Sequence, residues 1–142
     1  MSGLAAVLAG RRAPGVYRWH GAFEPAEVRH TVEHAGWRFG HLDGWGTESK
    51  AEFLAGIGEA LRFPAYYGQN LDALVDCLRD VEADPGLVLL WDGWGPFARA
   101  DEHAFRVTLD VLRERTAALG AGAFAVLLRG DGPDLDTVPS LD

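Results

Sequence analysis

Residues 30–34 read His-Thr-Val-Glu-His and have the spacing of a zinc motif found in metallopeptidases. Two histidines four residues apart on a helix lie on one face, as a pair of zinc ligands requires. At about 100° per residue, however, Val28 and Val32 form the buried stripe, and His30 and His34 lie opposite it. A catalytic zinc needs a shaped pocket and groups that orient its ligands, and a solvent-facing helix supplies neither. We therefore interpret both histidines as part of a solvated polar face and expect no metal site.

Three aspartates, Asp72, Asp76 and Asp80, recur every four residues in the segment 71–81. The apolar stripe of that segment consists of Leu74, Cys77, Leu78 and Val81. The helical period places the three carboxylates together on the opposite, exposed face. Asp72 and Asp76 repel each other weakly in a helix, and Arg79 beside them offsets part of the repulsion.

Two interpretations of this acidic face are open. The simpler one is a solvated helix surface. Tyr66 and Tyr67 directly precede the helix, however, and aromatic side chains beside carboxylates are typical of a surface that binds a basic protein. The tyrosines favour the second interpretation.

The sequence Asp-Gly-Trp-Gly occurs twice, at residues 43–46 and 92–95, each time after a predicted strand. In a parallel sheet both loops would lie at the carboxyl edge, where α/β proteins bind ligands. Asp43 and Asp92 could hold Mg²⁺ there, with Trp45 and Trp94 beside them. Neither a third ligand nor a phosphate loop supports this site. Two similar turns in a glycine-rich chain explain the repeated tetrapeptide more simply.

Charge and cysteine content restrict the class of protein. Acidic residues outnumber basic ones 21 to 13, and the net charge of −8 argues against nucleic-acid binding, which usually uses a basic face. Cys77 is the single cysteine, which excludes an intramolecular disulfide and is consistent with a reducing cytoplasm. Its place on the apolar flank of a helix indicates a core residue rather than a reactive thiolate. Because no stretch reaches the roughly 18 apolar residues of a membrane span, we expect a cytoplasmic protein that does not contact a membrane.

Strand and helix patterns alternate along the chain, which predicts an α/β fold with a mostly parallel sheet. We expect strands at 16–19, 37–42, 87–91 and 123–128, and helices at 25–35, from Thr47 or Ser49 to 61, 70–82 and 101–119. The runs 87–91 and 123–128 are apolar throughout, as in central strands with both faces covered. We expect residues 1–15 to be a flexible N-terminus, 16–129 one domain, and the Pro-, Gly- and Asp-rich residues 130–142 a disordered tail.

Residues 63–78 read Phe-Pro-Ala-Tyr-Tyr-Gly-Gln-Asn-Leu-Asp-Ala-Leu-Val-Asp-Cys-Leu. This segment closely resembles the signature of the barstar family, whose members are small cytoplasmic inhibitors of secreted microbial ribonucleases such as barnase. The resemblance extends more weakly from residue 36 to residue 128 through the order of the elements. It implies a small parallel sheet packed with helices, here with an added N-terminal strand and helix at 16–35, and no cofactor.

The resemblance also implies a site. The inhibitory surface of the family is the signature helix and the loop before it, and the acid at the position of Asp76 is its anchor, a mimic of the RNA phosphate. The acid at the position of Asp72 contacts the same basic cleft, and the tyrosine at the position of Tyr66 packs on the partner. The implied partner-binding residues are Tyr66, Tyr67, Gly68, Asn70, Asp72, Val75, Asp76, Arg79, Asp80 and Glu114. Glu114 matches a glutamate on the last long helix, and Val75 stands where the family often has a tryptophan.

We therefore expect an intracellular inhibitor that occludes the active site of a small basic ribonuclease with an acidic helix. Such a protein is not an enzyme and binds no nucleic acid directly. Val75 and the N-terminal addition motivate an alternative, an immunity or interaction module for another basic protein. A small-ligand-binding protein or metal-dependent enzyme that uses the strand-end aspartates is the third hypothesis.

Overall fold

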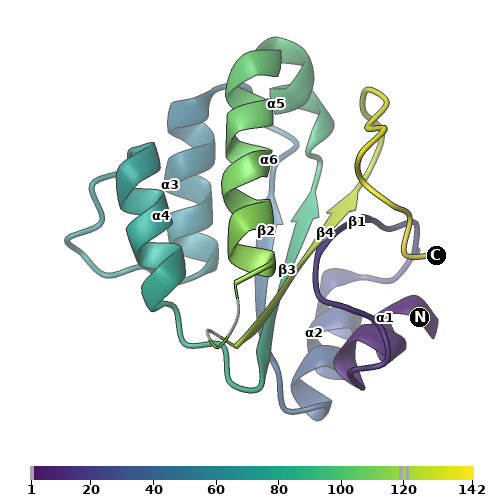
Figure 1. Cartoon of the computed structure of the whole chain (residues 1–142). Helices are drawn as coiled ribbons and strands as arrows, with labels where there is room; N and C mark the ends of the chain where they lie inside the picture. The colour runs from purple at the N-terminus through teal and green to yellow at the C-terminus, as the bar shows by residue number, and fades with distance from the viewer. Residues whose placement is uncertain (1, 119, 121) are drawn as a thin grey trace.

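The sheet is the centre of the molecule. A computed structural model describes residues 2–118, 120 and 122–142, and within them four parallel strands form one sheet in the order β1-β4-β3-β2 (Figure 1). The strands are β1 (Val16–Arg18), β2 (Arg38–Asp43), β3 (Gly86–Asp92) and β4 (Ala123–Arg129). The predicted α/β fold is confirmed, and the two apolar runs form the two central strands.

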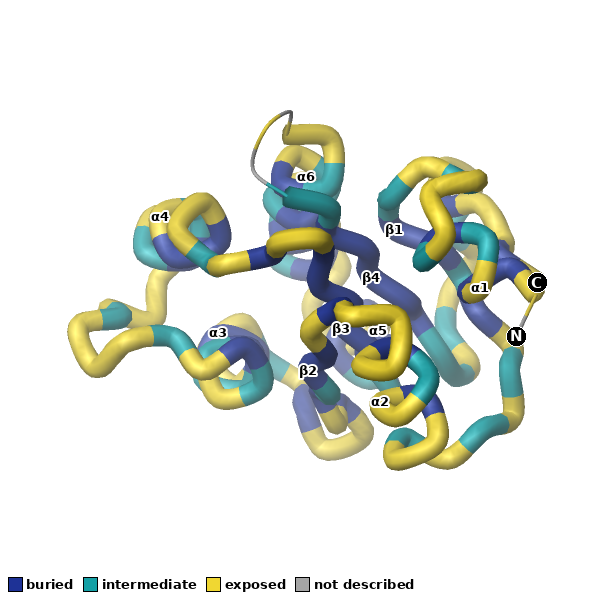
Figure 2. Tube along the Cα trace, turned by 90° about the horizontal axis from the view of Figure 1, so that it is seen from below, coloured by how far each residue is buried: buried dark blue, intermediate teal, exposed yellow. Residues whose placement is uncertain are grey.

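Helices cover both faces of the sheet (Figure 1). One face carries α3 (Lys50–Ala60), α4 (Leu71–Asp80), α5 (Gly95–Ala100) and α6 (Glu102–Thr116). The other carries α1 (Ser2–Leu8) and α2 (Pro25–His34). Figure 2 shows the central strands as the buried interior between these two helical layers.

The two faces explain why β3 has no polar alternation. Leu87, Leu89 and Trp91 enter the core beneath α3, α4, α5 and α6, whereas Val88 and Leu90 enter the core beneath α1 and α2. Successive side chains of a strand point to opposite faces, so a strand covered on both sides is apolar at every position.

The N-terminus differs from the flexible segment expected for residues 1–15. Residues 2–8 form α1, whose Leu4 and Val7 are 0% and 1% exposed and pack in the core of the second sheet face. Leu4 and Val7 are three residues apart and therefore share one face of the helix. The expectation was wrong because a run of six apolar residues is too short to show this periodicity. Met1 lies outside the described residues.

The C-terminal segment also differs from the disordered tail expected for residues 130–142. The tail runs along the open edge of β1, where the Leu141 N–H donates to the Arg18 carbonyl at 2.8 Å and the Arg18 N–H donates to the Pro139 carbonyl at 2.9 Å. Val138 and Leu141 are buried. Composition predicted disorder, but these two apolar side chains and a backbone ladder attach the tail to the sheet.

The helices begin close to the predicted positions. The Ser49 side chain accepts from the Glu52 N–H and begins α3, and the Asp101 side chain accepts from the Ala104 N–H and begins α6. Sequence reasoning missed α5, which has a proline in its first turn and only six residues. The last long helix was predicted to reach Leu119, a residue outside those described, and it ends at Thr116.

Among the described residues, no helix combines the length and the apolar character that crossing a bilayer would require.

Candidate functional site: the acidic face of α4 and its loop

The local sequence determines how α4 begins and which face it buries. Asn70, the first residue of the predicted helix, is the N-cap of α4, and its side-chain Oδ1 accepts from the Ala73 N–H at 2.8 Å. Leu74, Cys77 and Leu78 are buried beneath the helix, as their period predicts. Burial, with a smaller contribution from Asp80 and Asp76, raises the pKa of the Cys77 thiol. Cys77 is therefore a core residue whose thiol ionises less readily than a free one.

The acidic face is exposed as predicted. Asp72, Asp76 and Asp80 all lie on the solvent side of α4. Arg79 Nη1 lies 3.4 Å from Asp76 Oδ1, but both side chains are highly exposed, so this pair contributes little to stability. The three carboxylates are consequently available to a cationic partner.

The loop of residues 62–69 projects beside α4 (Figure 1). Its first and last residues, Arg62 and Gln69, are not glycines but adopt the left-handed backbone conformation, with φ values of 56° and 50°. Tyr66 is 76% exposed at its tip. Non-glycine residues hold this conformation only where the surrounding structure compels it, so the loop shape is specific.

Tyr67 anchors this loop to α3. Its hydroxyl donates to the Leu54 carbonyl at 3.0 Å, and its ring meets Phe63 edge-on at 4.9 Å between centroids. Gly58 makes room for the ring, since a Cβ there would lie 2.8 Å from it. Burial, with a smaller effect of Cys77, raises the pKa of Tyr67 to about 12. Of the two predicted tyrosines, Tyr66 faces outward and Tyr67 holds the loop in place.

We expect Tyr67→Phe to lower the free energy of unfolding by about 0.5–1.5 kcal/mol, because one partly buried hydrogen bond is lost. Tyr66→Phe is the matched control and should leave stability unchanged, since its side chain is exposed. Urea unfolding of the two variants measures the difference. Equal stability of both variants would contradict the anchoring role of Tyr67.

Glu114 comes from a different helix but lies beside the acidic face. It is exposed on α6 and lines a groove between α4 and α6 together with Val75 and Arg79. The structure thus brings Glu114 to the same side of the molecule as the signature helix. Gly68 is exposed in the loop, and Asn70, which is also exposed, follows the loop as the cap of α4.

Sequence reasoning missed two features around this face. One is the groove itself, whose far wall comes from Val111 and Ala118. The other is Arg62, which lines a second pocket with Tyr66 and Asp80 on the opposite flank of α4. Both depend on how separate elements pack, and no spacing along the chain signals them.

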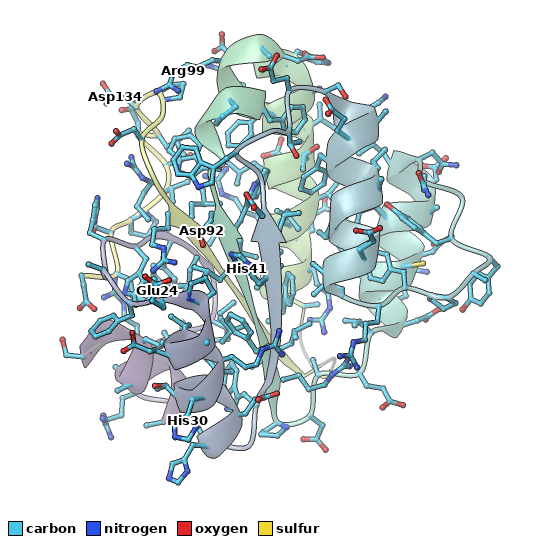
Figure 3. The ribbon with its side chains drawn as sticks, turned by 180° about the vertical axis from the view of Figure 1, so that it is seen from behind. Glu24, His30, His41, Asp92, Arg99 and Asp134 are labelled. Carbon is cyan, nitrogen blue, oxygen red and sulfur yellow. The ribbon has the colours of Figure 1, made fainter. Side chains whose placement is uncertain are left out.

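The two Asp-Gly-Trp-Gly loops meet at the carboxyl edge of the sheet, as predicted. Asp43 and Asp92 are register partners, but only Asp92 is enclosed. Arg129 donates two hydrogen bonds to the Asp92 carboxylate, from Nε to Oδ1 at 2.6 Å and from Nη2 to Oδ2 at 3.0 Å. His41 Nε2 lies 2.8 Å from Asp92 Oδ2, and Figure 3 shows these two side chains together. Both oxygens of the Asp92 carboxylate are thus bound by protein groups.

The same cluster ties the N-terminal addition to the sheet. Arg129 Nη1 donates to the carbonyls of Gly21 and Phe23, in the segment that leads into α2. Burial alone would raise the pKa of Asp92, but the hydrogen bonds and charges of Arg129 and His41 outweigh it and lower that pKa. An aspartate with a depressed pKa stabilises the fold in its ionised form.

We expect acid to weaken the fold through Asp92. The contribution of this carboxylate is complete above the ordinary aspartate pKa of about 3.9 and is lost as the pH falls through its lower folded value. Melting temperatures measured from about pH 6 to about pH 2.5 should therefore fall more steeply for the wild type than for Asp92→Asn. Parallel curves for the two proteins would contradict this.

Trp45 and Trp94, the aromatic residues of the two loops, have different environments. Trp94 is completely buried, and its Nε1 donates to the Gly130 carbonyl at 3.2 Å. Trp45 is 56% exposed and lies against Gly93, which has a φ of 70°. Trp94 is thus a core residue, and the loops together close the end of the sheet.

The histidines of α2 lie on its exposed side, opposite the buried Val28 and Val32, as their period predicts. The rings of His30 and His34 are 6.0 Å apart, and Figure 3 shows His30 pointing away from the molecule. In the part of the chain that the structure describes, no three histidine, cysteine, aspartate or glutamate side chains are grouped to hold a metal ion.

Comparison with known proteins identifies this arrangement. The family described as Barstar (barnase inhibitor) matches residues 37–129, more than half of the chain and all of the acidic face of α4 and its loop. The chain belongs to the barstar family. The barstar match begins just before β2 and ends with β4, so α1, β1, α2 and the tail lie outside it.

A solved structure supports the fold alone. The chain is similar to the ORC2 protein of Aeropyrum pernix in its ADPNP–ADP complexes, with a TM-score of 0.61 and 15% sequence identity. The match covers 91% of this chain and 38% of that chain. The chain therefore spans well under half the length of that protein.

Proposed function

We propose that this barstar-family protein is a cytoplasmic inhibitor of a small basic ribonuclease and is not itself an enzyme. The observation that carries the proposal is the exposed acidic face of α4 within the barstar match, with Asp76 at its centre. The description of the family, a barnase inhibitor, names the same activity.

The proposed mechanism is occlusion. A ribonuclease binds the phosphates of its substrate with cationic side chains, and an exposed carboxylate on a rigid helix can take the place of a phosphate. Asp76 and Asp72 enter the cleft, Glu114 contacts its rim, and Tyr66 packs on the nuclease surface. Tyr67 and the Asn70 cap keep the loop and the first turn in the binding shape, so little order has to be gained on binding.

A titration tests this function. Purified protein is added to a small guanyl-specific microbial ribonuclease, and RNA cleavage is followed. We expect cleavage to fall linearly and to end at one equivalent. Full activity at a large molar excess over a panel of such basic nucleases would contradict the proposal.

Salt should act mainly on the rate of association. Opposite charges steer the encounter, and the Debye length shrinks from about 10 Å at 0.1 M salt to below about 5 Å at 0.5 M. Stopped-flow measurements should therefore show a strongly reduced association rate constant and a much smaller change in the dissociation rate constant. An association rate constant that is indifferent to salt would contradict electrostatic steering.

A further inference from the structure

A groove of about 190 Å³ lies between α4 and α6, directly beside the acidic face. Val75 and Leu78 line it from α4, and Val111 and Ala118 line it from the α6 side. An apolar cavity of about 150 Å³ is large enough to bind benzene, so the groove has room for one large side chain.

The floor of the groove is held by Arg115. This side chain is buried, its Nε donates to the Leu78 carbonyl at 2.8 Å, and its Nη1 donates to the Gly122 carbonyl at 3.2 Å. Its guanidinium also lies over the Phe124 ring, with Cζ 5.4 Å from the centroid. These contacts tie α4, α6 and β4 together, so the groove exists before any partner binds.

The groove itself is lined by two arginines and one glutamate, and the carboxylates that favour a cationic partner lie beside it on α4. Val75 and Arg79 lie on α4 between the groove and the acidic face, so the groove and the face form one continuous surface. Glu114 is exposed at the groove and forms no ion pair with the described residues. An apolar recess beside a face of three carboxylates is complementary to an apolar side chain that has lysine or arginine on the side facing Asp72 and Asp76.

We propose that the α4–α6 groove receives one aliphatic or aromatic side chain that projects from the basic partner, beside the cations that bind Asp72 and Asp76. The inference rests on the proposed function and adds a specificity determinant to it: the partner carries the protruding side chain, and this chain carries the recess. Anchors of this kind lie at the centre of protein interfaces, where water is excluded.

The first experiment needs no partner. Indole is titrated into the protein, and methyl chemical shifts are followed by NMR. We expect saturable shifts confined to Val75, Leu78 and Val111. In Ala118→Phe the new ring fills the groove, and the indole-induced shifts should vanish. Ala117→Phe is the matched control, because Ala117 is an exposed neighbour that does not line the groove, and it should keep the shifts. Melting temperatures of both variants report whether they are folded. Unshifted methyl signals in the wild type would overturn the proposal.

The second experiment uses a nuclease that the wild type inhibits. Ala118→Phe should weaken inhibition about tenfold or more, and Ala117→Phe should leave it within about twofold. Exposed apolar residues near the nuclease active site are then replaced by alanine, one at a time. We expect one such replacement to weaken inhibition by the wild type but not inhibition by Ala118→Phe. That non-additivity identifies the side chain that enters the groove.

Two results separate this inference from the proposed function. If Asp76→Ala abolishes inhibition while Ala118→Phe and Ala117→Phe inhibit equally well, the acidic face binds the nuclease and the groove proposal is overturned. If Asp76→Ala inhibits as well as the wild type, the proposed function fails, and the groove proposal, which rests on it, falls with it.

Discussion

Deletion of residues 1–36 is expected to abolish cooperative folding. These residues contain the edge strand β1 and the helices α1 and α2, which cover one face of the sheet together with Leu141 of the tail. Without them Val88, Leu90, Ala125 and Leu127, now completely buried, would face water. Apolar burial is the dominant favourable contribution to folding, and the net stability of a domain is only about 5–15 kcal/mol. The segment 37–129 matched by the family therefore depends on the rest of this chain.

Circular dichroism and dye binding measure this effect. The truncated chain should melt without a cooperative transition and should bind a hydrophobic dye, as exposed cores do. Leu4→Ala perturbs the same core less and should lower the free energy of unfolding by about 2–5 kcal/mol, because it leaves a cavity at a fully buried position. Arg11→Ala, an exposed control in the same segment, should change stability by less than about 0.5 kcal/mol. A truncated chain that melts like the full one would contradict the dependence.

Asp76→Ala is expected to cost about 2–5 kcal/mol of binding to the inhibited ribonuclease, because a buried interfacial charge pair loses one member and leaves the other unpaired. The same substitution should barely change stability. The side chain is exposed, its pair with Arg79 is weak, and its removal relieves repulsion with Asp72. Inhibition constants and melting temperatures measure the two effects separately.

Two controls define the result for Asp76→Ala. Leu74→Ala should destabilise the fold by about 2–5 kcal/mol, since Leu74 is 0% exposed beneath α4. His30→Ala, on the exposed face of α2, should change neither stability nor inhibition. If Asp76→Ala destabilised the fold as much as Leu74→Ala, the assignment of the faces of α4 would be wrong. Unchanged inhibition by Asp76→Ala would place the binding surface elsewhere.

The core of the fold was predictable because its signals are local. The runs 87–91 and 123–128 have no polar alternation, and this alone predicts central strands of a parallel sheet. Asn70 caps α4 as its residue type suggests, and the period of Leu74 and Leu78 assigns the buried face. These features depend on neighbours within one element, where sequence patterns are informative.

The N-terminus, the tail and the groove were not predictable for the opposite reason. Leu4 and Leu141 are buried in the same core although they stand at opposite ends of the chain. The carboxylate of Asp142 accepts from the Gly3 N–H at 3.0 Å, a contact across nearly the whole sequence. Val75 and Val111 likewise meet across the α4–α6 groove, and only the packing of the helices brings them together.

The most direct test of occlusion is the dependence of inhibition on substrate. With a ribonuclease that the protein inhibits, steady-state cleavage is measured over a range of RNA and inhibitor concentrations. If the acidic face of α4 fills the active site, RNA and the protein exclude each other, and the apparent inhibition constant rises linearly with RNA concentration while the maximal rate is unchanged. An apparent inhibition constant that does not depend on RNA concentration would show that both bind at once and would contradict the account.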